Sequence, residues 1–141
     1  MKFELDHIGI AVESLEKGFE FYRALGFENL EIEEVSSEKV KVGFMQMGPE
    51  VEPDVGVSRL ELLEPMGEES PIAMFLQKRG PGIHHICLRV KDIHKVVDDL
   101  LSKGVQLINN EPKKGAHNCL VVFVHPKSTG GVLLELSQPI K

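Results

Sequence analysis

One short stretch of this sequence occurs twice, and this repeat constrains the fold more than any other feature. Residues 5–12 (LDHIGIAV) are echoed by residues 83–90 (IHHICLRV), so that His7 aligns with His85 at an offset of 78 positions. Both stretches alternate and are rich in β-branched residues, as strands are. Each runs into an amphipathic segment that ends at a glycine, which indicates a helix. We therefore expect two copies of one structural module.

A second echo lies near the end of each copy. Residues 60–65 (LELLEP) correspond to residues 134–139 (LELSQP), now at an offset of 74 positions. The offset falls from 78 to 74 positions, which is the change that a short deletion in one loop of the second copy would produce. Each copy therefore carries one histidine on its first strand and one glutamate on its last strand, and these four residues are His7, Glu61, His85 and Glu135.

Each copy has the element order β-α-β-β-β. A four-stranded sheet from one module would expose its edges. Two copies related by a pseudo-twofold axis would cover each other and enclose a cleft. The sequence thus predicts an α+β fold with a single domain over residues 1–141, in which module one covers about 1–66, a linking helix covers 70–79 and module two covers about 81–141. We expect helices after Ser14, Ser70 and Asp92 and strands at 3–12, 27–35, 40–46, 57–64, 82–90, 105–108, 119–124 and 132–138.

Composition narrows the classes of function. The chain has 141 residues, a net charge of −6 and no cluster of lysine and arginine, which argues against a nucleic-acid partner. The apolar runs are too short to span a bilayer, and the first residues lack the features of a signal peptide. Cys87 and Cys119 each lie inside an apolar run, which predicts buried, reduced thiols. We expect a cytoplasmic protein with no membrane partner.

The two histidines and two glutamates of the repeat form a plausible metal-binding set. Two imidazoles and two carboxylates without a thiolate disfavour a structural zinc site and suit Co²⁺, Mn²⁺, Ni²⁺ or catalytic Zn²⁺. Any one of the four side chains could instead face solvent. Their duplicated placement argues otherwise, and Glu61 and Glu135 each lie between leucines, where an unpaired buried carboxylate would be costly. A shared cation would remove that cost.

Other polar residues are secondary candidates. His84 neighbours His85 but points to the opposite face of its strand, so we interpret it and its counterpart Asp6 as supporting or structural residues. The turn at residues 125–131 combines a cation, two hydroxyls and two glycines, as many turns do. Three of its residues are candidates for binding an anionic group of a substrate, namely Lys127, Ser128 and Thr129.

At these motifs the chain resembles the methylmalonyl-CoA epimerases, a family of the vicinal-oxygen-chelate superfamily that also includes glyoxalase I. The resemblance covers essentially the whole chain. Its first-strand motif, residues 6–12 (DHIGIAV), would fit many members of the superfamily. The segments that are more specific to the epimerases are residues 70–73 (SPIA) and 125–136 (HPKSTGGVLLEL).

The resemblance implies both a ligand set and a reaction. The four repeated residues would hold a divalent ion, with Co²⁺ as the first expectation, and a CoA thioester would be the substrate. Removal of the C2 proton of methylmalonyl-CoA gives an enolate, and its return on the other face gives the other epimer. The resemblance implies that Glu135 is a metal ligand and also one of the bases. We further expect a homodimer.

One departure from the family leaves the second acid/base group open. Several bacterial epimerases carry a glutamate on the third strand, where this chain has Val42. Glu34, Glu38 or a loop group remain alternatives, and the loop at 48–56 is longer than the family would imply. Two other functions also stay open. One is glyoxalase I, which uses a near-identical metal set, and the other is a metal-free ligand-binding protein of the same fold.

Overall fold

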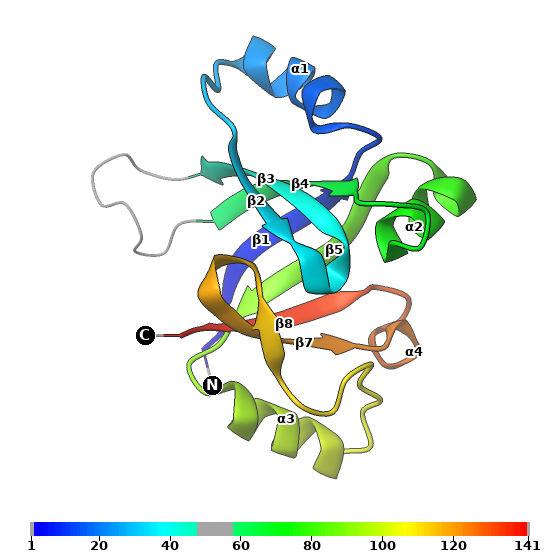
Figure 1. Ribbon diagram of the computed structural model, residues 1–141. Coiled ribbons are helices and arrows are strands. Elements are labelled where there is room, and N and C mark those ends of the chain that lie inside the picture. Colours follow the sequence, from blue (N-terminus) through cyan, green and yellow to red (C-terminus); the bar gives the residue numbers. More distant parts are fainter. Residues whose placement is uncertain (1, 48–57, 141) are drawn as a thin grey trace. The chain divides into compact units, whose positions relative to one another are not determined.

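The computed structural model describes residues 2–47 and 58–140, and the chain divides into two units. The N-terminal unit comprises residues 7–84. The C-terminal unit comprises residues 85–141 together with residues 1–6. In Figure 1 the N-terminal unit runs from blue to green, and the C-terminal unit runs from green to red and also includes the dark blue start of the chain. The long loop expected at 48–56 lies outside the described residues.

Four consecutive strands of the eight-stranded sheet, in the order β2-β3-β4-β1, form the centre of the N-terminal unit. Strands β2, β3 and β4 pair in antiparallel fashion, and β1 joins β4 in parallel over residues 7–11. The elements of this half are β1 (Glu4–Ala11), α1 (Leu15–Leu25), β2 (Glu31–Val35), the 3-10 helix η1 (Ser36–Glu38), β3 (Val40–Met47), β4 (Ser58–Pro65) and α2 (Pro71–Arg79).

The C-terminal half repeats this plan. Its strands follow the order β5-β8-β7-β6, with β5 and β8 parallel and the other pairs antiparallel. The repeated β-α-β-β-β order confirms the α+β class. The elements are β5 (Gly82–Arg89), α3 (Ile93–Ser102), β6 (Lys113–Gly115), the 3-10 helix η2 (Ala116–Asn118), β7 (Cys119–Val124), α4 (Pro126–Thr129) and β8 (Leu134–Pro139).

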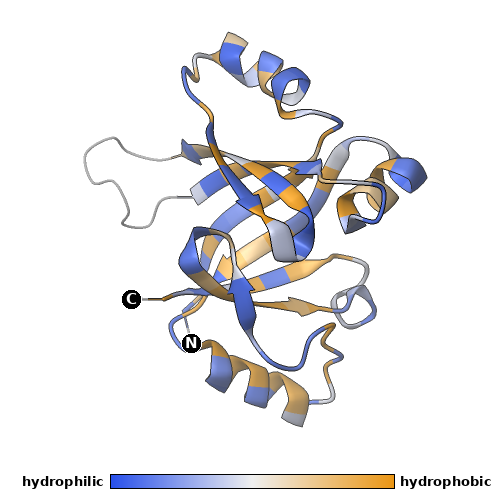
Figure 2. Ribbon diagram, in the orientation of Figure 1, coloured by the Kyte–Doolittle hydropathy of each residue, from blue (hydrophilic) through white to orange (hydrophobic). Residues whose placement is uncertain are grey.

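Each unit has a hydrophobic core of its own between its helix and its sheet. In the N-terminal unit, Phe19 of α1 packs with Met45 and Leu62 of the sheet. In the C-terminal unit, the buried stripe of α3 packs against strands β7 and β8. That stripe follows the helical period, so that apolar and polar residues separate along α3 (Figure 2). The buried residues of this second core are Val90, Ile93, Val96, Val97, Leu107, Val122, Val124 and Leu136.

The helix boundaries largely follow the sequence signals. The side chains of Ser14, Ser70 and Asp92 accept hydrogen bonds at the starts of α1, α2 and α3, as predicted. Gly26 ends α1 in the left-handed conformation, with φ of 119°. Among the described residues, no helix is both long enough and apolar enough to cross a membrane.

Two of the expected strands were wrong in part or in whole, and two short elements were not expected. Residues 27–30 are not a strand, because Phe27 and Leu30 pack into the core instead of pairing. Residues 105–108 form only one isolated bridge, between Leu107 and Val124. The unexpected elements are β6, which lies where no strand was expected, and α4, which lies within the turn at 125–131 and begins at Pro126.

Candidate metal centre

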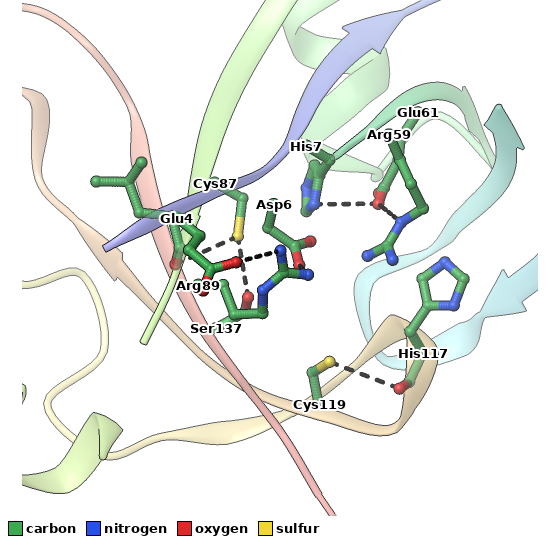
Figure 3. A network of polar contacts seen from close by, with 11 residues as sticks. Glu4, Asp6, His7, Arg59, Glu61, Cys87, Arg89, His117, Cys119 and Ser137 are labelled. Atoms are coloured by element: carbon green, nitrogen blue, oxygen red, sulfur yellow. Dashed lines mark hydrogen bonds and ion pairs between the residues drawn. The ribbon is translucent and has the colours of Figure 1, made fainter. Parts of the chain in front are cut away.

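The first histidine and the first glutamate of the repeat are in contact inside the N-terminal unit. Strands β1 and β4 run parallel with Gly9 opposite Glu61, which brings His7 and Glu61 to one face of the sheet. His7 Nδ1 lies 3.0 Å from Glu61 Oε2 (Figure 3). His7 is 6% and Glu61 4% exposed. This is a buried imidazole–carboxylate pair on two neighbouring strands.

An arginine approaches the same carboxylate oxygen. Arg59 Nε donates a hydrogen bond to Glu61 Oε2 at 3.4 Å, and the Arg59 guanidinium carbon lies 6.0 Å from the centre of the Phe44 ring. The register of β3 and β4 places Phe44 opposite Glu61. Because alternate residues of a strand share a face, Arg59, Glu61 and Phe44 line the same side of the sheet. The carboxylate of Glu61 therefore has an imidazole and a guanidinium beside it.

The second pair forms in the C-terminal unit. His85 Nε2 of β5 lies 3.2 Å from Glu135 Oε1 of β8, and the two residues are only 7% and 8% exposed. Cys87 and Phe123 flank Glu135 on the neighbouring strands. The His85 ring meets the Phe123 ring edge-on, with 5.9 Å between the ring centres. The second copy of the repeat thus reproduces the buried histidine–glutamate contact of the first.

The donor set of the two pairs fits a divalent cation. Two ligands that bind one ion at right angles, each at about 2.1 Å, lie about 3.0 Å apart. The nitrogen–oxygen distances of 3.0 and 3.2 Å in the two pairs agree with that separation. Imidazole with carboxylate is also a borderline-to-hard donor set that suits Co²⁺, Mn²⁺, Ni²⁺ or Zn²⁺. Each pair can therefore occupy two adjacent positions of a coordination shell. The convergence of both pairs on one ion stays a prediction.

Asp6 and His84, which we interpreted as supporting residues, contact side chains outside the candidate ligand set. Asp6 is 3% exposed, and Arg89 Nη1 donates a hydrogen bond to its Oδ1 at 3.1 Å (Figure 3). Arg89 Nη2 also donates to Glu4 Oε2 at 3.2 Å. These contacts hold the start of β1 to β5 within the C-terminal unit. His84 meets Phe75 of α2 edge-on, with 5.0 Å between the ring centres.

The third-strand position where several bacterial epimerases would have a glutamate is occupied by a buried apolar side chain. Val42 is 3% exposed and shares its sheet face with Phe44 and Glu61. The β2 residue opposite Val42 is Glu33, whose half-buried side chain therefore belongs to that face. Glu34, which the sequence analysis considered, lies opposite Lys41 and belongs to the other face.

Two residues of this face were missed by sequence reasoning. Arg59 lies two positions before Glu61 on the same strand, so period-two alternation alone would have connected them. Glu33 could be found only through the register of β2 against β3, which a single sequence does not fix.

In the turn that we considered for anion binding, both hydroxyls bond to backbone groups of the C-terminal unit. Ser128 Oγ accepts a hydrogen bond from Gln106 N at 2.9 Å. Thr129 Oγ1 accepts one from Val132 N at 3.0 Å and donates one to Pro126 O at 3.2 Å. These bonds shape the turn. The Lys127 side chain is exposed.

Comparison with known proteins gives one consistent result over the whole chain. Residues 6–123 match the family model of the glyoxalase/bleomycin resistance protein/dioxygenase superfamily. The chain is 43% identical to the mitochondrial methylmalonyl-CoA epimerase of Homo sapiens over 136 residues, which are 95% of this chain and 73% of that protein. It is 42% identical to the ethylmalonyl-CoA/methylmalonyl-CoA epimerase of Cereibacter sphaeroides, with 95% and 96% of the two chains covered. A solved methylmalonyl-CoA epimerase in complex with methylmalonyl-CoA and NH4+ has a TM-score of 0.90, at 36% identity and with 99% and 96% of the two chains covered.

Proposed function

The chain belongs to the methylmalonyl-CoA epimerase family of the glyoxalase superfamily, and we propose that it interconverts the two C2 epimers of methylmalonyl-CoA. One observation carries the proposal. In each half, the repeated histidine and glutamate are buried and in contact with each other, in a chain that matches epimerases over nearly its whole length. Glyoxalase I is not favoured, because the relatives named above, which match 95% or more of this chain, are epimerases.

The chemistry needs a base, a conjugate acid and a way to stabilise negative charge. The C2 hydrogen of methylmalonyl-CoA lies between a thioester and a carboxylate, so its removal leaves an enolate. A base on one face removes the proton and an acid on the other face returns one, which inverts C2. We propose Glu135 as one of these two groups. Its oxygen lies beside His85 in the C-terminal unit, and burial keeps water from competing for the proton.

We propose that His7, Glu61, His85 and Glu135 together hold one divalent ion, with Co²⁺ as the first choice. When bound, the ion would act as a Lewis acid toward the developing enolate. The imidazoles must bind in their neutral form and the carboxylates in their ionised form, so the set carries two negative charges toward a divalent cation. Mn²⁺, Ni²⁺ and Zn²⁺ suit the same donors.

The cellular setting belongs to the same proposal. We place the protein in the cytoplasm, in the metabolism of propionate, and we expect a homodimer. The first of these expectations is supported by Cys87 and Cys119, which are buried and form no disulfide. The other two rest on the family resemblance.

Exchange of the C2 hydrogen tests the function directly. The purified full chain, loaded with Co²⁺, should convert each epimer of methylmalonyl-CoA into the other in D2O and incorporate deuterium at C2. Elemental analysis of protein prepared without added metal should find a divalent ion at about one per chain. The matched control is methylglyoxal with glutathione, which should give no lactoylglutathione. Turnover of the control substrate without C2 exchange would contradict the proposal.

A further inference from the structure

We propose that Arg59 is a positioning residue, which holds the Glu61 carboxylate in the orientation that binds the metal ion. The inference rests on the proposed function, because it takes Glu61 to be a ligand of that ion. It concerns a residue outside the expected ligand set. All of the contacts that carry it lie within the N-terminal unit.

The contacts define how the carboxylate is held. Arg59 Nε and His7 Nδ1 both lie beside Glu61 Oε2, at 3.4 and 3.0 Å (Figure 3). The hydrogen bond from Arg59 Nε to one of the two oxygens restricts the rotation of the carboxylate about its own axis. An oxygen has two lone-pair directions, so the Arg59 contact leaves a direction of Oε2 for another partner and also leaves Oε1. Arg59 therefore orients the group without closing it to a cation.

The guanidinium is itself held in place. It lies over the ring of Phe44, with 6.0 Å between the guanidinium carbon and the ring centre. Phe44 is 6% exposed and pairs with Glu61 across β3 and β4. On β1, His7 pairs with Arg59 in the parallel register. Three adjacent strands thus bring His7, Arg59, Glu61 and Phe44 to one face. In this arrangement Glu61 is the metal ligand, and Arg59 is the hydrogen-bond partner that orients it.

Two effects of Arg59 on a bound ion oppose each other. Its charge repels a divalent cation, whereas its contact keeps a ligand in position. The Arg59 side chain is 19% exposed, so solvent screens part of the repulsion, and the adjacent carboxylate offsets the same charge. We therefore expect positioning to dominate. Hydrogen-bond partners of metal ligands typically contribute about 10- to 100-fold to metal affinity.

The test measures metal binding without relying on turnover. Co²⁺ is titrated calorimetrically into the metal-free full chain, and the visible absorption of bound Co²⁺ reports its coordination geometry. Arg59→Met keeps an unbranched apolar side chain but removes the charge and the donors, so it should weaken Co²⁺ binding about 10- to 100-fold and alter the absorption spectrum. Arg59→Lys, which keeps a charge and donors, should recover most of the affinity. Thermal unfolding of the metal-free variants checks that they fold.

Two controls separate the possible failures. Arg23 also lies over a phenylalanine ring, 4.9 Å from the centre of Phe19, so Arg23→Met removes a comparable stacked cation on α1 and should leave Co²⁺ binding unchanged. His7→Ala tests the metal site itself. If His7→Ala binds Co²⁺ as the wild type does, the proposed metal site is wrong. If His7→Ala loses affinity while Arg59→Met matches or exceeds the wild type, only the positioning role is overturned. Equal losses in Arg59→Met and Arg59→Lys would also overturn it.

Discussion

The Glu64 carboxylate accepts a hydrogen bond from the backbone N–H of Leu15 at 2.8 Å. Glu64 lies near the end of β4 and Leu15 is the first residue of α1, so the last strand of the module caps its helix. The C-terminal half repeats the contact, because Gln138 Oε1 accepts from Ile93 N at 2.8 Å. The same two offsets that relate the metal-ligand candidates also relate these caps, so the duplication extends to the bonds that join helix to sheet.

Because Glu64 caps α1 through an acceptor oxygen, we expect substitutions of Glu64 to lower stability when they remove that oxygen and not when they remove only the negative charge. Glu64→Ala leaves the N–H of Leu15 without its side-chain acceptor and should lower the free energy of unfolding by about 1 kcal/mol. Glu64→Gln is the matched control, because Gln138 performs the same task in the other half with an amide oxygen. Chemical denaturation of the metal-free protein measures both. Equal losses in the two variants would point to the charge instead.

Replacement of Glu135 should separate binding from chemistry. Glu135→Gln keeps an oxygen that can ligate but removes the basic carboxylate, so turnover should fall by about 10²- to 10⁴-fold while Co²⁺ remains bound. Glu61→Gln makes the same exchange at a residue that we propose as a ligand alone. It should keep far more of the wild-type rate. C2 deuterium exchange at matched metal occupancy is the measurement, and near wild-type exchange in Glu135→Gln for both epimers would leave Glu135 as a ligand only.

Glu33 and Glu34 provide a matched pair for the second acid/base group. Glu33 is half-buried and shares the sheet face of Glu61, whereas Glu34 is exposed on the other face. We expect Glu33→Gln to slow epimerisation by about 10²-fold or more while one epimer still exchanges its C2 proton, since the base on the other face remains. Glu34→Gln should behave as the wild type. An unimpaired Glu33→Gln would return the search to the loop at 48–56 and to Glu38.

The duplication was sufficient to predict the β-α-β-β-β order of each half and to place one histidine on its first strand and one glutamate on its last strand. Its two offsets identify equivalent positions, and period-two alternation tells which side chains share a face. The four repeated residues are therefore identifiable without coordinates, whereas the contacts of His7 with Glu61 and of His85 with Glu135 come from the structure. What the alternation could not give is the register between strands that are distant in sequence, and that register determines the neighbours of each glutamate.

Features that depend on tertiary packing were beyond sequence reasoning. Phe27 and Leu30 look like strand residues but pack into the core of the N-terminal unit. Strand β6 is only three residues long and includes two lysines, so neither its length nor its composition distinguishes it from a loop. The contact between Arg59 and Glu61 depends on rotamers that Phe44 and His7 help to fix.

A glycine in β3 is required by close packing. A Cβ at Gly43 would lie 2.8–3.0 Å from three side-chain atoms of Leu30, including its branching carbon. Leu30 is itself packed against the core, so it has little room to retreat. Gly43→Ala should therefore lower the free energy of unfolding by about 1–3 kcal/mol, as overpacking of a core does. Denaturant unfolding of the metal-free protein measures the change.

Gly82 is the control for the intrinsic effect of the same substitution. It also lies in a strand, and a Cβ there would have no neighbour within 4 Å. Gly82→Ala should be neutral or should stabilise the fold by about 0.4–1 kcal/mol, because alanine has fewer unfolded conformations to lose. The difference between the two variants then isolates the contact with Leu30. In the double variant Gly43→Ala with Leu30→Ala, the added methyl no longer meets the leucine side chain. The cost of Gly43→Ala should then shrink, whereas an undiminished cost would show that the strain arises elsewhere.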